Sequence, residues 1–73
     1  MVIIASRLRA LRKSKGLTQK QVGEAVGIAE RNYRRYEAGT TDPLTPATAA
    51  IAEYFGVSID YLVGRTENPE VNH

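Results

Sequence analysis

The chain has 73 residues, a formal net charge of +2, no cysteine and a single histidine, His73, at its end. A chain of this length builds one domain around a modest core. Its composition excludes disulfides, thiolate metal sites and histidine-based catalysis, and the apolar run within residues 1–5 is too short for a signal peptide or a membrane span. We therefore expect an intracellular single-domain protein without a metal, a cofactor or a membrane role.

The charges are unevenly distributed along the chain. Residues 1–39 carry nine lysines and arginines against three glutamates, a net charge of +6, whereas residues 40–73 carry a net charge of −4. This division suggests that one side of the molecule faces a polyanion. A solvated surface with segregated charges gives the same totals, so composition alone leaves both interpretations open.

The first predicted helix covers about residues 3–14. Ile4, Leu8 and Leu11 recur at helical spacing with polar residues between them, which is typical of an amphipathic helix. Gly16 follows as a helix stop. No segment of the chain shows a comparably strong strand pattern, so an all-α fold is predicted.

The second predicted helix covers about residues 18–26. Thr18 is a suitable N-cap, and Gln21, three residues later, completes a capping box. Gly23 lies inside this helix, where glycine costs about 1 kcal/mol relative to alanine, and we interpret it as a point of close approach by another helix. Gly27 is a candidate left-handed residue and predicts a sharp turn.

The third predicted helix covers about residues 29–37 and ends at Gly39. Ala29, Tyr33 and Tyr36 are spaced i, i+4 and i+7, so they share one face. The three arginines of this segment fall on the opposite face. We interpret the tyrosines as core and the arginines as the part that meets a partner.

Two more helices are predicted after a loop with two prolines. The fourth begins at Pro46, with Thr45 as its N-cap, and ends at Gly56. Ser58 caps a short fifth helix over residues 59–63, whose apolar residues suggest a weak dimer interface.

Residues 65–73 are polar and have no helical pattern, so we interpret them as a mobile tail. The predicted domain therefore covers residues 1–64. The sequence contains no second domain, so we expect no ligand-sensing domain, and regulation through dimerisation, abundance or a partner.

The second and third predicted helices are joined by about three residues, which is the layout of a helix-turn-helix. In such a unit the first helix crosses the DNA backbone and holds the second in the major groove. The segment LTQKQVGEAVGIAERNYRRYEAG resembles the helix-turn-helix of the Cro/CI-type, lambda-repressor-like XRE family. The matching features are Leu-Thr-Gln at 17–19, the small residue Gly23, the turn at 27–29 and Glu-x-Gly at 37–39.

The resemblance extends over residues 3–64 and implies a compact five-helix lambda-repressor-like fold. The residues that it places at base edges are Glu30, Arg31, Arg34 and Arg35. The residues that it places at DNA phosphates are Gln19, Lys20, Thr40 and Thr41. Arg12 and Glu37 match a pair that forms a partly buried salt bridge between the first and third helices.

These residues need not share one role. Arg31 lies in the first turn of the third helix and Arg35 lies one turn later on the same stripe, so we expect both at base edges. Arg34 is nearer the edge of the stripe and should behave more like a phosphate contact. The resemblance also implies that Gln19 braces the first recognition residue.

The sequence departs from the family pattern at the start of the third helix. Ala29 stands where a Ser or Thr cap is usual, a loss of about 0.5–2 kcal/mol if nothing substitutes. Glu30 stands where glutamine is frequent. A carboxylate accepts from cytosine N4 but cannot donate to adenine or guanine, so base preference cannot be carried over.

The resemblance favours a sequence-specific DNA-binding transcriptional regulator, most simply a cytoplasmic bacterial or phage repressor that binds a palindromic double-stranded operator as a homodimer. The alternative is a protein-interaction module, such as an antitoxin or adaptor, with the same fold. A partner-binding face should offer apolar anchors, whereas this helix offers arginines, which taken alone are also typical of a solvated face. No catalytic constellation stands out, so we expect a non-enzyme.

Overall fold

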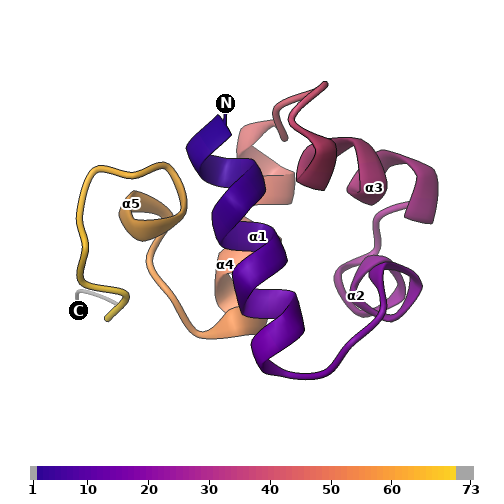
Figure 1. Ribbon diagram of the computed structural model, residues 1–73, viewed down its shortest axis with the longest axis horizontal. Coiled ribbons are helices and arrows are strands. Elements are labelled where there is room, and N and C mark those ends of the chain that lie inside the picture. The colour runs from indigo at the N-terminus through magenta and orange to yellow at the C-terminus, as the bar shows by residue number, and fades with distance from the viewer. Residues whose placement is uncertain (1, 71–73) are drawn as a thin grey trace.

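The computed structural model describes residues 2–70, and all regular structure in this range is helical. The helices are α1 (Val2–Ser14), α2 (Gln19–Val26), α3 (Glu30–Ala38), α4 (Thr45–Phe55) and α5 (Ile59–Leu62). In Figure 1, α1 crosses the centre of the view, α2 and α3 lie on one side of it and α5 lies on the other. The predicted all-α fold with a helix-turn-helix at α2 and α3 is confirmed.

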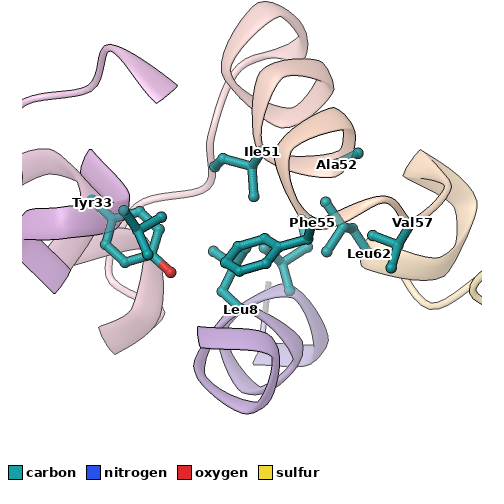
Figure 2. Close-up of a cluster of buried hydrophobic side chains, with 9 residues drawn as sticks. Leu8, Tyr33, Ile51, Ala52, Phe55, Val57 and Leu62 are labelled. Carbon is teal, nitrogen blue, oxygen red and sulfur yellow. The ribbon is translucent and has the colours of Figure 1, made fainter. Parts of the chain in front are cut away.

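The core lies where α1, α3, α4 and α5 converge. Figure 2 shows Leu8, Ile51 and Phe55 turned toward one another between α1 and α4, with Tyr33 reaching in from α3. Leu8, Ile51 and Tyr33 are fully buried, and burying an apolar side chain of this size stabilises the fold by about 1.5–3 kcal/mol. Tyr36 is partly buried against the same cluster, so the interpretation of the tyrosines as core is confirmed.

The predicted start of the fourth helix is wrong. Leu44, rather than Thr45, is the N-cap of α4 because it adopts the extended backbone, φ −72° and ψ 166°, that a cap requires. Pro46 still falls in the first turn, where its missing N–H has no partner to lose. Ala29 is the N-cap of α3, as the resemblance implied; it makes no side-chain cap bond and is exposed. It lies outside the helix, so the i, i+4 geometry does not bring it onto the buried face of Tyr33.

The segment after α5 lies against the rest of the molecule. The Arg7 guanidinium sits 4.0 Å from the centroid of the Tyr61 ring. It also donates to the backbone carbonyls of Tyr61 at 2.6 Å and Thr66 at 3.0 Å. These contacts count against a mobile tail over residues 65–70, and residues 71–73 lie outside the described part of the chain.

The turn between α2 and α3 is built on two glycines. Gly27 has a left-handed backbone, φ 76°, and its N–H donates to the carbonyl of Gly23. The N–H of Ile28 donates to the same carbonyl at 2.8 Å. A Cβ at Gly23 would lie 2.7 Å from the Ile28 carbonyl oxygen and 3.6 Å from the Cα of Glu30. The close approach predicted at Gly23 is therefore made by the turn itself, and it fixes where α3 begins.

Replacing Gly23 with alanine should destabilise the protein, although alanine is the better helix former by about 1 kcal/mol. A carbon 2.7 Å from a backbone oxygen cannot be relieved by a rotamer change, so the turn must shift. We expect a loss of about 1–3 kcal/mol in urea unfolding. Glu24→Ala, at an exposed position of the same helix, is the control and should change little. Equal or greater stability of Gly23→Ala would contradict this account.

Candidate nucleic-acid interface

Helix α3 has one buried face and one charged face. Arg31, Arg34 and Arg35 are exposed, whereas Tyr33 and Glu37 are buried. Tyr33 packs into the core on one side of the helix, and the arginines extend from the opposite side. The division of α3 into an inward and an outward face, which the sequence predicted, is present in the structure.

The three arginines of α3 have different surroundings. The Arg34 guanidinium donates to the carboxylate of Glu30, one turn earlier, and its Nε donates to the Gln19 side-chain oxygen at 3.3 Å. Within residues 2–70, neither Arg31 nor Arg35 has a side-chain hydrogen bond or an ion pair. Arg34 is thus held against α2, while Arg31 and Arg35 can turn toward a ligand.

Gln19, the first residue of α2, connects α2 to α3. Its amide nitrogen donates to a carboxylate oxygen of Glu37 at 3.3 Å, and its amide oxygen accepts from Arg34. Among the described residues, Gln19 makes no direct hydrogen bond to Glu30 and is linked to it through Arg34. Both of its polar atoms have partners inside the protein, so it positions α3 directly.

The other predicted phosphate contacts come from α2 and from the loop after α3. Lys20 is exposed in the first turn of α2, near one end of the helix-turn-helix. Thr40 and Thr41 are exposed in the loop that directly follows α3. The Thr40 hydroxyl donates to the backbone carbonyl of Arg35 at 3.3 Å, so one of its roles is to satisfy the end of α3.

Arg12 and Glu37 form a bidentate ion pair between α1 and α3. The Arg12 Nε and Nη2 atoms donate to the two carboxylate oxygens of Glu37 at 2.6 and 3.0 Å. Its Nη1 donates to the carbonyl of Leu17 at 2.9 Å, so one guanidinium joins α1, the segment before α2, and α3. Glu37 is only 2 % exposed, and its charge depends on these donors.

Burial and hydrogen bonding shift the pKa values of this cluster. Burial alone would raise the pKa of Glu37, but hydrogen bonds from Arg12 and Gln19 outweigh it and hold that pKa below its ordinary value. Burial raises the pKa of Tyr33 well above its usual range, and the Glu37 carboxylate raises it further. The Tyr33 hydroxyl has no hydrogen-bond partner of normal geometry among the described residues. Both groups therefore keep their usual charge states at neutral pH.

A pocket of about 270 Å³ opens beside this cluster, where α1, α2 and α3 meet. Its charged and polar lining consists of Arg9, Arg12, Lys13, Gln19, Arg34 and Glu37. Arg9 and Lys13 were not among the predicted site residues. Their i, i+4 spacing, which places them on one face of α1, was the available signal.

The described residues at this site offer positive charge and hydrogen-bond donors. Within residues 2–70, no three potential metal ligands lie together. None of the helices in this range combines the length and apolar character that crossing a bilayer requires. The arrangement suits recognition of an anionic partner.

Removing one partner of the buried pair should be costly because it leaves a desolvated charge. We expect Glu37→Ala to lower the free energy of unfolding by about 3–5 kcal/mol. Glu30→Ala, which breaks the exposed pair with Arg34, is the matched control and should cost about 0.3–0.5 kcal/mol. Urea unfolding of Arg12→Ala, Glu37→Ala and the double variant measures the coupling, and a coupling near zero would contradict the pair's role.

Acid should weaken the fold through Glu37. Because its pKa is lowered in the folded state, its contribution is fully present above the unfolded pKa of about 4.3. That contribution is lost as the pH falls through the folded pKa. Thermal unfolding of the wild type and Glu37→Gln between neutral pH and about pH 2.5 should show a shallower acid dependence in the variant. Identical slopes would show that Glu37 does not titrate as inferred.

The comparisons with known proteins agree with this geometry. Residues 8–62 match the Helix-turn-helix family. The chain is 41% identical to the "Uncharacterized HTH-type transcriptional regulator YobD" of Bacillus subtilis, covering 88% of this chain and 57% of YobD. It is 32% identical to the cryptic phage CTXphi transcriptional repressor RstR of Vibrio cholerae, covering 89% of this chain and 59% of RstR.

The chain is also 36% identical to the antitoxin PezA of Streptococcus pneumoniae, covering 85% of this chain and 39% of PezA. It thus spans a little under three-fifths of the first two relatives and about two-fifths of the third. The family match includes α2, the turn and α3, together with most of α1 and all of α4 and α5. The chain therefore belongs to the XRE-type, lambda-repressor-like helix-turn-helix family of transcriptional regulators.

Proposed function

We propose that this protein is a sequence-specific DNA-binding transcriptional regulator, most simply a repressor, that places α3 in the major groove. The observation that carries this proposal is the state of Arg31 and Arg35. Both are exposed on a helix whose other face is locked by Tyr33 and Glu37, and neither has a side-chain partner within residues 2–70. A guanidinium in this state can donate its forked N–H groups to O6 and N7 of guanine.

The neighbouring residues support a division of roles along α3. Arg34 is held by Glu30 and Gln19 at the edge of the helix, which suits a phosphate contact better than a base contact. Glu30 is half-buried and paired, so we propose that it accepts from a cytosine only if Arg34 releases it. Lys20 remains a proposed phosphate contact on the adjoining helix.

We further propose a homodimer on a palindromic operator, with half-sites about one helical turn apart. The sequence suggested an interface at α5 from Ile59, Tyr61, Leu62 and Val63. Leu62 is 1 % exposed and belongs to the core, whereas Ile59 is 42 % exposed, so Ile59 is the better candidate contact. Binding titrations run to saturation should give two chains per operator, and one chain per duplex would contradict the dimer.

A protein-interaction role is the second candidate, and one observation favours it. A largely apolar cavity of about 450 Å³ lies between α4 and α5, lined in part by Ala49, Ala52, Val57 and Ile59. A partner protein seated there would leave the arginines of α3 exposed. Because that role gives the exposed arginines no partner, we propose DNA binding as the main function. We also propose that the protein is not an enzyme and that it acts in the cytoplasm, where a bacterial regulator meets its DNA.

Alanine substitutions of the three arginines test the main proposal. After selection of bound sites from a random duplex pool, Arg31→Ala and Arg35→Ala should weaken cognate binding about 5- to 150-fold, as loss of a bidentate base contact does. They should weaken binding to a scrambled duplex much less. Arg34→Ala should lower both affinities together and reduce the salt slope by about one unit. If all three variants bind cognate DNA as the wild type does, the arginines are a solvated face.

A further inference from the structure

We propose that the pocket lined by Arg9, Lys13 and Arg34 binds a phosphodiester of the DNA backbone. Helix α1 would then contact one strand beside the groove that α3 enters. This inference rests on the proposed DNA-binding function and adds a contact surface on α1.

The pocket adjoins the recognition helix. It has a volume of about 270 Å³ and is lined from α1 by Arg9 and Lys13, from α2 by Gln19 and from α3 by Arg34. Arg34 therefore belongs both to this pocket and to the charged face of α3. A duplex that receives α3 in its groove has a backbone along the edge of that groove, and the pocket lies at this edge of the helix.

The pocket carries uncompensated positive charge. In the wall of the pocket, Glu37 pairs with Arg12, and Glu30 pairs with Arg34. Arg9 and Lys13 have no carboxylate partner among the described residues. An anion entering the pocket therefore meets two cations that no protein carboxylate shares.

One of these cations is already oriented. The Arg9 Nη2 donates to the backbone carbonyl of Glu37 at 3.0 Å, which anchors one side of its guanidinium. The remaining N–H groups keep the fork geometry that phosphate oxygens accept. Lys13, one helical turn further along α1, adds a second positive charge. Because Arg9 is already anchored, less ordering of its side chain is needed when a phosphate binds, which favours affinity.

The charge pattern of the chain indicates why DNA would use this side of α3. Residues 36–64 contain no lysine or arginine, so the loop after α3 and the helices that follow supply no cation to a phosphate backbone. Thr40 and Thr41 in that loop offer only neutral hydrogen bonds. Nine of the ten lysines and arginines lie in residues 1–35, so the neutralisation of backbone charge, which dominates affinity for DNA, comes mainly from this part of the chain.

The test compares Arg9→Gln, Lys13→Gln and the double variant with the wild type. Glutamine removes the charge and retains a side-chain donor, and thermal unfolding checks that each variant is folded. Arg65→Gln is the matched control, because it removes one positive charge beside Asp60 and outside the pocket. Binding to cognate and scrambled duplexes is measured across a salt series.

Each pocket substitution should reduce the slope of log K against log salt by about 0.9 and lower both affinities together. The ratio of cognate to scrambled affinity should stay unchanged, and Arg65→Gln should keep the wild-type slope. Unchanged slopes in Arg9→Gln and Lys13→Gln would overturn the proposal that the pocket binds DNA phosphate. If Arg31→Ala then still loses cognate preference, the proposed function stands without it.

A titration with inorganic phosphate tests whether the pocket binds a free phosphate compound instead of a phosphodiester of DNA. It is titrated into the wild type and the double variant while the Arg9 Nε–H resonance is followed by NMR. Saturable binding of inorganic phosphate, with duplex salt slopes insensitive to the substitutions, would assign the pocket to a free phosphate compound and overturn its role on DNA. A wild type that binds no duplex at any salt concentration would overturn the pocket and the proposed function together.

Discussion

The ion pair between Arg12 and Glu37 sets the position of the helix that carries the exposed arginines. Both carboxylate oxygens of Glu37 accept from Arg12, which also holds the carbonyl of Leu17 just before α2. Gln19, the first residue of α2, donates to the same carboxylate. One buried carboxylate thus joins α1, α2 and α3. Rotation of α3 would leave this charge unpaired, and an unpaired buried charge costs several kcal/mol.

This constraint helps to hold α3 in place in a 73-residue chain whose core is small. Apolar packing of Tyr33 is tolerant of small rotations, whereas bidentate hydrogen bonds are directional. A base edge also accepts hydrogen bonds only over a narrow range of angles. The directional pair on the inner face of α3 therefore limits how α3 can turn, and with it the positions from which Arg31 and Arg35 extend. Gly23 contributes by fixing the residue at which α3 starts.

The positive charge of residues 1–39 serves two different purposes. Arg7 is occupied by the ring of Tyr61 and by two backbone carbonyls, and Arg12 is occupied by Glu37. These arginines hold the fold together and offer little charge to a ligand. Others, such as Arg31, have no partner within the described residues. The net charge of this half is therefore larger than the positive charge that is available to a polyanion. Only the contacts in the structure distinguish the cations that hold the fold together from those that can bind a ligand.

The sequence by itself determined the local structure, because caps, turns and helical faces depend on residues three or four apart. The capping box of Thr18 and Gln21 and the left-handed Gly27 occur as the sequence predicts, and they place the helix-turn-helix. Only the tertiary structure decided that Arg34 binds Gln19, fifteen residues away, and that Leu62 belongs to the core. Those outcomes depend on which helix faces meet, and the spacing of residues along one helix carries no information about the helix packed against it.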